Sequence, residues 1–370
     1  MQKKVEISKV DENFKINNQD NKNLKWIDPK NSNLVKVYGL NWFYKDFRYH
    51  RFPKETDETI KNLSGSLDVL TANTSGGSIA FYSNTKTLKI KVKLSYMFHM
   101  GHMPYTGQAG FDLYLGKSFN ELKFYRSSNF DFNNYEYEFT FFENAEINDI
   151  NLHMLNFPLY ASVDEVLIGI DEDATIYSEE NLFPNSGKIV FYGTSITQGG
   201  CASRPGSSYT QVVARHLGYE CLNFGFSGNG KGQIEVAEIL SKIENVKMFV
   251  LNYEANVYFD QLKQTVWNFI AKLRETYPTV PIILMSKIRF FDENHFASVK
   301  KTEHMIRTYQ RNVVKKLSQT DNNIYYYDGS KLLGSDFEEK TVDGVHPNDY
   351  GFYSIAKVVE KFIAKKLANK

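Results

Sequence analysis

Three residues with the side chains needed for acyl-transfer chemistry lie in two short segments of the sequence. Ser195 follows the apolar run 188–192, inside the segment Gly-Thr-Ser-Ile-Thr at 193–197. Asp343 and His346 are three residues apart in Asp-Gly-Val-His-Pro, shortly before the last expected helix. A serine nucleophile needs a base that takes its proton and an acid that orients the base. The sequence therefore predicts Ser195 as nucleophile, His346 as base and Asp343 as orienting acid.

Each of these residues also has an ordinary structural explanation. A serine in a Gly-Thr-Ser turn can cap a helix, and an isolated Asp-x-x-His can be a surface turn. Position favours the catalytic interpretation, because Ser195 falls where the first strand of the C-terminal half ends. The sequence contains no Gly-x-Ser-x-Gly elbow, so the usual α/β-hydrolase arrangement is disfavoured.

An acyl-transfer site also needs hydrogen-bond donors for the oxyanion that develops on the substrate. Besides the Ser195 N–H, the Gly-rich loop 223–230 offers the backbone N–H of Gly228. That loop could instead bind phosphate or simply be flexible, although no Gly-Lys-Ser/Thr follows and a Walker motif is excluded. Asn256 offers a side-chain amide, with Asn252 as its rival, and either asparagine could be a turn former.

Three further polar residues are candidates for contact with a substrate: Arg204, Glu254 and His102. Arg204 could equally pair with a carboxylate of the fold, and Glu254 could be a surface charge. His102 lies in a His- and Met-containing loop, 97–104, which either reaches the mouth of the site or packs beside a domain interface. Two histidines and three methionines at loose spacing are a weak metal signal, so no metal site is predicted.

The elements expected around these residues change in kind near residue 184. Up to residue 184, short runs alternate apolar and polar residues, which predicts strands with one wet face, as at 88–94 where Lys89, Lys91 and Lys93 alternate with apolar residues. We therefore expect an all-β sandwich or jelly roll over 1–184, with strands near 78–82, 88–94, 110–115, 135–141 and 163–170. The first ~35 residues are expected to be a loose arm or an extra edge element.

The pattern over 185–370 is strand–helix alternation, which predicts a three-layer, flavodoxin-like α/β domain with a five-stranded parallel sheet. Ser195, Gly228, Asn256 and the Asp343–His346 pair then fall just after strands or on late loops, at the edge where such sheets bind ligands. Strands are expected at 188–192, 220–224, 247–252, 280–286 and 323–327. Helices are expected at 207–217, 233–243, 259–277, 296–318 and 352–367.

Composition narrows the class of protein. The 370 residues are 42% hydrophobic and 24% charged, with a formal net charge of +1, so no nucleic-acid partner is expected. The N-terminus lacks the apolar core of a signal peptide and no run is long enough to span a membrane, which favours a cytoplasmic protein unless a signal was removed. With two cysteines, Cys201 and Cys221, free thiols are favoured over a disulfide.

The segments around Ser195, Gly228, Asn256 and His346 resemble the four blocks that name the SGNH hydrolase superfamily, also called GDSL esterases. The resemblance covers roughly 186–368 and implies the triad and the three oxyanion donors already named. Thr194 stands where the family usually has Asp, and the third block departs from Gly-x-Asn-Asp. Both departures are similar to a subgroup with a β-rich N-terminal domain, and the whole chain also resembles two-domain carbohydrate esterases.

The sequence therefore predicts a serine esterase that removes acetyl or another small acyl group from a carbohydrate or similar polyol. The resemblance implies no cofactor. Two alternatives remain at this stage: an acyltransferase that uses the same residues, and a non-catalytic carbohydrate-binding protein on the same scaffold. The partner expected in each case is a small molecule or a carbohydrate, and the sequence does not fix the oligomeric state.

Overall fold

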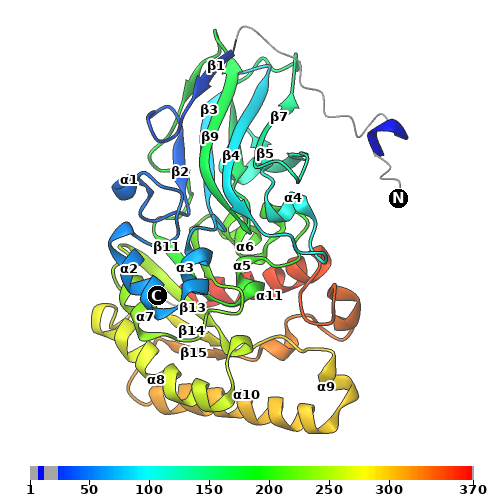
Figure 1. The fold of residues 1–370 in the computed structure, drawn as a ribbon. Coiled ribbons are helices and arrows are strands. Elements are labelled where there is room, and N and C mark those ends of the chain that lie inside the picture. The colour runs from blue at the N-terminus through cyan, green and yellow to red at the C-terminus, as the bar shows by residue number, and fades with distance from the viewer. Residues whose placement is uncertain (1–6, 12–23, 369–370) are drawn as a thin grey trace.

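The computed structural model describes residues 7–11 and 24–368, and its ribbon shows a β-rich part stacked on an α/β part (Figure 1). Much of the expected N-terminal arm lies outside the described residues. Of the rest, Ile7–Lys9 form a 3-10 turn, and Leu24–Ile27 form β1, an edge strand paired with β9. The expected extra edge element is therefore present at β1.

Two antiparallel sheets form the β-rich part, one in the order β1-β9-β4-β7 and the other β10-β3-β8-β5-β6, with β2 paired to β3. Their inward side chains share one core, so the part is a sandwich. The strands are β1 (Leu24–Ile27), β2 (Lys36–Tyr38), β3 (Ser78–Ser83), β4 (Leu88–Met97), β5 (Asp112–Gly116), β6 (Lys123–Ser127), β7 (Glu136–Phe142), β8 (Asn151–Asn156), β9 (Ala161–Asp171) and β10 (Ile176–Tyr177). The helices here are α1 (Phe43–Asp46), α2 (Asp57–Leu63), α3 (Gly65–Thr71) and α4 (Tyr105–Gln108).

Strand β4 shows how far the alternation predicts burial. Lys91 and Lys93 are exposed while the apolar residues between them are buried, as the period of two requires. Lys89, expected on the wet face, is buried instead. Its Nζ lies 3.9 Å from a carboxylate oxygen of Glu138 and 4.0 Å from one of Glu143, so these acidic neighbours offset the cost of burying its charge.

The α/β part has the predicted five-stranded parallel sheet, in the order β12-β11-β13-β14-β15. Helices α6 and α11 share a core with one face, and α7, α8 and α10 with the other, which makes three layers. The strands are β11 (Lys188–Gly193), β12 (Glu220–Gly225), β13 (Val246–Asn252), β14 (Ile282–Met285) and β15 (Ile324–Tyr327). The helices are α5 (Ser195–Gln198), α6 (Tyr209–Leu217), α7 (Ile234–Leu240), α8 (Phe259–Thr276), α9 (Asp292–His295), α10 (Ala297–Leu317) and α11 (Asp349–Ala368).

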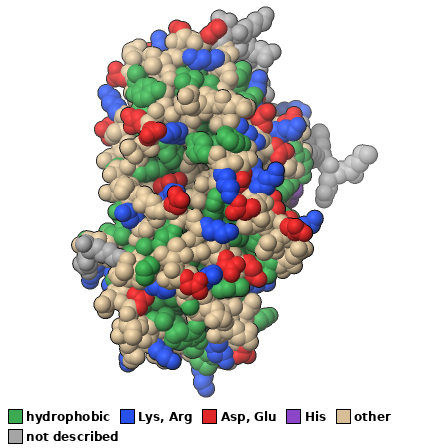
Figure 2. Space-filling model, turned by 90° about the vertical axis from the view of Figure 1, so that its left-hand side faces the viewer, with side chains coloured by type: hydrophobic (Ala, Val, Ile, Leu, Met, Phe, Trp, Pro, Cys, Tyr) green, Lys and Arg blue, Asp and Glu red, His purple; other side chains and the backbone are tan. Residues whose placement is uncertain are grey.

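The surface is consistent with the balanced charge of the chain. On the face shown in Figure 2, basic and acidic side chains are interspersed rather than gathered into regions of one sign. None of the described helices combines the length and the apolar character that a membrane span requires.

The sandwich has its own core, but some residues of the N-terminal half pack into the core of the α/β part. Trp42, Ile60 and Leu67, from the N-terminal half of the sequence, lie in the same apolar cluster as Phe224 and Phe269 of the α/β part. Helices α2 and α3 are therefore packed onto the α/β layer rather than inside the sandwich. The division into domains 1–184 and 185–370 stays a prediction.

Arg51 is a fully buried charge at this junction. Its guanidinium donates to the carbonyl oxygens of Leu70 and Asn223, at 2.6 and 3.3 Å, and to that of Gly225. It also lies over the Phe226 ring, 4.4 Å from the centroid. Arg51 thus joins α3 of the N-terminal half to the end of β12, where the Gly-rich loop begins.

We expect Arg51→Met to lower the free energy of unfolding by at least about 2 kcal/mol, because it removes buried hydrogen bonds from a charged donor, each of which contributes roughly 1.5–3 kcal/mol. Urea unfolding followed by circular dichroism measures the change. Arg311→Met is the control, since Arg311 is exposed on α10 and its ion pair with Asp328 is worth at most about 1 kcal/mol. Equal losses in the two variants would contradict a special role for Arg51.

Candidate active site

Ser195, His346 and Asp343 form a continuous hydrogen-bonded chain. The Ser195 Oγ lies 3.0 Å from His346 Nε2, and His346 Nδ1 lies 2.7 Å from Asp343 Oδ2. With Nδ1 protonated toward the carboxylate, Nε2 is left to accept the serine proton. The structure therefore brings together the three residues that the sequence predicted as a triad, in the order that the chemistry needs.

A tight turn holds the acid beside the base. Asp343 Oδ1 accepts hydrogen bonds from the backbone N–H groups of Val345, at 3.0 Å, and His346, at 2.7 Å. Gly344, at φ +83°, supplies the left-handed backbone between them, and a Cβ there would meet the Phe291 ring at 2.6 Å. Partial burial opposes ionisation of Asp343, but the hydrogen bonds from His346 and Val345 outweigh it and lower its pKa. The acid is thus held as a carboxylate facing the imidazole.

The turn from β11 into α5 places the half-buried Ser195 at the carboxyl end of the sheet. Strand β11 lies between β12 and β13, which is the position where the strand order reverses and where open α/β sheets bind ligands. A Cβ at Gly193 would come within 2.2 Å of Thr197 Oγ1, so the sharp turn needs glycine. Thr194, which stands where the family usually has Asp, is buried and accepts a hydrogen bond from the Ile196 N–H at 3.3 Å. It therefore caps the short helix that carries Ser195.

The loop after β12 carries the predicted oxyanion glycine. Gly228 has φ +66°, and a Cβ added to it would have no atom within 4 Å, so the residue borders open space. In the described part of the chain its N–H donates to no acceptor. The Ser195 N–H, at the first position of α5, also has no acceptor within its helix. These two backbone donors are therefore available for a substrate oxygen.

The two rival asparagines have different contacts from those expected. Asn256 Nδ2 donates to the carbonyl oxygens of Phe226 and Gly230, at 3.1 and 3.2 Å, and so clamps the loop that carries Gly228. Asn252 is buried and donates to the carbonyls of Met285 and Ser286 at the end of β14. In this structure Asn256 positions the oxyanion loop, and direct donation from its amide remains a prediction.

Gln198, which the sequence reasoning did not single out, links the parts of the site. It lies one turn after Ser195 and is fully buried. Its Oε1 accepts from the Ser227 N–H at 2.9 Å, next to Gly228. Its Nε2 donates to Asn73 Oδ1 and to the Leu159 carbonyl, both at 3.0 Å and both in the N-terminal half. Its neighbours in the sequence are mostly Ser, Thr and Gly, so no local pattern set it apart.

A cavity of about 350 Å³ opens beside the oxyanion loop. Its apolar wall comes from the N-terminal half, and its polar rim includes Ser227 and Asn229, which flank Gly228. The Tyr160 hydroxyl in its lining lies 3.4 Å from the Ser195 carbonyl oxygen, which fixes the cavity next to the nucleophile. The lining residues are Ser66, Val69, Leu70, Phe98, Met100, Tyr160, Ser227 and Asn229. The loop that starts after β4 therefore does reach the mouth of the site.

Arg204 is held by the sandwich, in contrast to its predicted role in substrate binding. Its Nη1 donates to Asp112 Oδ2 at 3.0 Å and to the Tyr114 hydroxyl at 2.6 Å, and its guanidinium covers the Phe124 ring at 3.8 Å. Asp112 is fully buried and also accepts from the Gly206 N–H at 2.8 Å. The alternative that Arg204 pairs with a carboxylate of the fold describes the structure, and Arg204 joins the two parts.

Glu254 is likewise a structural residue here. Its side chain is buried, and it accepts hydrogen bonds from the Lys287 N–H, at 3.0 Å, and from the Gln310 amide. Burial raises the pKa of Glu254, with the Lys287 and Gln310 contacts acting in the opposite direction. The structure therefore provides no surface on which Glu254 could meet a substrate.

His102 is the one predicted substrate contact that lies beside the triad. Its ring centroid is 5.5 Å from that of His346, and its Nε2 is 4.0 Å from Asp343 Oδ2. Cys201 lies close by, but burial and the Asp343 charge raise the pKa of its thiol to about 12, which makes it a poor nucleophile. Both Cys201 and Cys221 are free and buried, as the sequence favoured.

The comparisons with known proteins agree with this geometry. Residues 186–364 match the model of the GDSL-like lipase/acylhydrolase family. Residues 24–176 match the model for the N-terminus of SGNH-hydrolase-type esterases, which is named GxDLY. That pattern occurs here as Gly110-Phe-Asp-Leu-Tyr114, and its Asp112 and Tyr114 are the residues that hold Arg204. No curated protein sequence gives a significant match.

Solved structures share the whole two-part architecture. A protein described as a GDSL-like lipase from Bacteroides ovatus ATCC 8483 has a TM-score of 0.84 and 28% identity, covering 94% of this chain and 98% of that chain. Salicylyl-acyltransferase SsfX3, from a tetracycline biosynthetic pathway, has a TM-score of 0.75 and 18% identity over the same shares. A family two carbohydrate esterase from Clostridium thermocellum, solved with cellohexaose, has a TM-score of 0.58 and 16% identity, covering 80% and 93%.

We expect Gln198→Leu to lower kcat for ester hydrolysis about 10- to 100-fold, with a much smaller change in KM. The Ser227 N–H loses its acceptor, so the adjoining Gly228 N–H moves away from the developing charge, and small displacements cost this much. Steady-state kinetics on p-nitrophenyl acetate, with folding checked by circular dichroism, measures the changes in kcat and KM separately. Gln264→Leu, exposed on α8, is the matched control. An unchanged kcat in a folded Gln198 variant would rule out this positioning role.

Proposed function

We propose that the chain is a serine esterase that hydrolyses acetyl or other small acyl esters of carbohydrates or similar polyols. The observation that carries the proposal is the Ser195–His346–Asp343 hydrogen-bonded chain, and the unpaired Gly228 N–H is the proposed oxyanion donor. The match of residues 186–364 to an acylhydrolase family model supports the reaction class. The preference for acetyl groups and for carbohydrates is the more specific part of the proposal.

In the first half of the reaction the enzyme is acylated. The Ser195 Oγ attacks the ester carbonyl carbon while His346 Nε2 takes the hydroxyl proton, and the Asp343 carboxylate stabilises the imidazolium that forms. The tetrahedral intermediate collapses as the bond to the alcohol oxygen breaks. His346 returns its proton to that oxygen, so the alcohol leaves neutral and the acyl group stays on Ser195.

In the second half water replaces the alcohol. His346 takes a proton from water, whose oxygen attacks the acyl carbon, and then returns the proton to Ser195 Oγ as the carboxylic acid leaves. In both halves negative charge develops on the carbonyl oxygen, where the N–H groups of Ser195 and Gly228 would receive it. Gln198 and Asn256 hold the second of these donors in place from two sides of its loop.

The substrate class rests on the site and on shared architecture. The cavity joins an apolar wall to polar atoms of Ser227 and Asn229, which suits an ester whose alcohol carries hydroxyl groups. The carbohydrate esterase from Clostridium thermocellum, solved with cellohexaose, has the same fold, and its likeness supports a carbohydrate substrate at the level of fold alone.

We expect Ser195→Ala to lower hydrolysis of p-nitrophenyl acetate by at least about 10³-fold, because loss of a triad member removes covalent catalysis and leaves only binding and the oxyanion donors. His346→Ala should lose a similar factor, since the two residues act as a unit. Ser298→Ala, an exposed serine on α10, should retain full activity. A folded Ser195→Ala protein with wild-type turnover would refute the proposal.

Acyl transfer to a second alcohol is the competing function, because the salicylyl-acyltransferase shares the fold over almost the entire chain. The His346 side chain is 21% exposed, so water can reach the acyl-enzyme. We therefore expect released acetate to account for the consumed ester even when a sugar acceptor is present in excess. Chromatography of the products measures this balance, and accumulation of acetylated acceptor at the expense of acetate would favour the transferase.

A further inference from the structure

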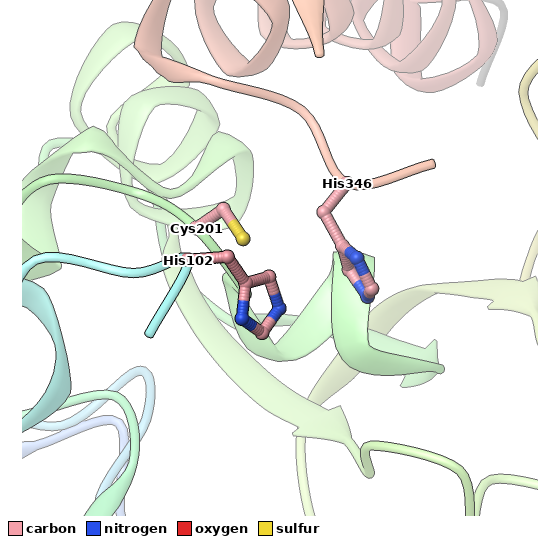
Figure 3. Close-up of side chains that lie close together, drawn as sticks. All are labelled: His102, Cys201 and His346. Atoms are coloured by element: carbon pink, nitrogen blue, oxygen red, sulfur yellow. The ribbon is translucent and has the colours of Figure 1, made fainter. Parts of the chain in front are cut away.

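A cluster of metal-ligating side chains lies against the catalytic base. His102, Cys201 and His346 each offer one ligand atom, and these atoms all lie within 4.8 Å of one another. Figure 3 shows the two imidazole rings and the sulfur next to one another, each carried by a different segment of the chain. The loop after β4, the loop after α5 and the loop before α11 supply the three residues. The proposed esterase chemistry uses only His346 among them.

We propose that this cluster binds a zinc ion, or a metal with the same preference for nitrogen and sulfur ligands, and that the bound ion reversibly blocks the active site. Imidazole nitrogen and cysteine sulfur are the donors that select zinc over magnesium or calcium. The metal site stands independently of the esterase assignment, whereas the inhibition rests on the proposed function.

Zinc binding requires only a small movement of the three ligand atoms toward one another. Tetrahedral zinc, with bonds of about 2.0–2.1 Å to nitrogen and about 2.3 Å to sulfur, places its ligand atoms roughly 3.3–3.6 Å apart. The ligand atoms here lie within 4.8 Å of one another, so the most distant pair must approach by up to about 1.2–1.5 Å. His102 is exposed on the loop between β4 and α4, and its side chain can make that movement. Asp343, with Oδ2 4.0 Å from His102 Nε2, or a water molecule would complete the tetrahedron.

Metal binding would disable the base whichever nitrogen of His346 is used. Nε2 faces the Ser195 hydroxyl, and Nδ1 faces the Asp343 carboxylate. A metal on Nε2 removes the acceptor of the serine proton, and a metal on Nδ1 breaks the contact with the orienting acid. The Cys201 thiol loses its proton to solvent as the metal–sulfur bond forms, so binding needs no oxidant or reductant.

The cluster is not the group that the sequence pattern suggested. The weak metal signal was the His and Met content of the loop 97–104, but His99 is directed to Tyr105, with its ring centroid 6.0 Å from the tyrosine ring. Met97 and Met103 are buried in apolar cores. Only His102 of that loop joins the cluster, and its two partners come from the α/β part.

Cobalt(II) tests the site without any substrate, because a thiolate ligand gives it a sulfur-to-metal charge-transfer absorption. We expect the metal-free wild-type chain to develop this band with one equivalent of cobalt and to lose it when zinc is added. Cys201→Ser should abolish the band, and Cys221→Ser, which changes the other buried thiol, should keep it. No band in folded wild-type protein, or a band that survives Cys201→Ser, would overturn the proposal.

His102→Gln provides a second variant whose folding is not at risk, since the side chain is exposed. It should weaken zinc binding, measured by competition with cobalt, at least about tenfold, because losing a ligand costs no less than losing a supporting contact. His99→Gln, in the same loop but outside the cluster, is the matched control. Equal zinc affinity in His102→Gln and wild type would remove His102 from the site and contradict the proposed ligand set.

Activity measurements test the second half of the proposal. Zinc should inhibit p-nitrophenyl acetate hydrolysis by the wild type, and a chelator should restore the rate. The inhibition constant, with each protein compared with its own zinc-free rate, should rise at least about tenfold in His102→Gln. A cobalt band without inhibition would overturn the inhibitory role alone. Absence of all turnover in zinc-free protein would count against the esterase assignment, while the cobalt result would still decide the metal site.

Discussion

The arrangement of the site depends on one buried side-chain amide. Gln198 lies in the turn that carries Ser195, accepts a hydrogen bond from the oxyanion loop and donates to two acceptors in the N-terminal half. Its backbone carbonyl also accepts from Ser75 Oγ at 2.6 Å. A buried amide is costly unless its hydrogen bonds are made, so the three segments that satisfy it must fold into one geometry together. That geometry ties the loop that carries Gly228 to the short helix that carries Ser195.

Contacts across the junction between the two parts make the N-terminal half a part of the site. The guanidinium of Arg51, in the N-terminal half, binds carbonyls on both sides of the junction. Arg204, in the α/β part, binds Asp112 and Tyr114 of the sandwich. Apolar residues of α2 and α3 share a core with the parallel sheet, and α3 forms one wall of the cavity. The sandwich thus shapes the space beyond the oxyanion loop, which the α/β layer alone leaves open.

The sequence predicted the features that depend on residues close together in the chain. The strand–helix alternation and the period-two strands follow from short-range hydrophobic periodicity, and the triad follows from residue types at strand ends. The contacts of Arg204, Glu254, Asn256 and Gln198 are different, because each depends on a partner more than 25 residues away in the chain. Lys89 shows the same limit, since its burial depends on acidic neighbours on another strand and loop. The sequence therefore could not predict the contacts of polar side chains that join distant segments.

The central claim is that Ser195 is a nucleophile activated by His346 in an assembled site. The most direct measurement is intact-mass and peptide mass spectrometry of the chain after reaction with a fluorophosphonate. The account predicts one phosphonate adduct per chain, on Ser195, with labelling strongly slowed in His346→Ala. A folded wild-type protein that takes up no adduct, or that takes it up on another residue, would contradict the account.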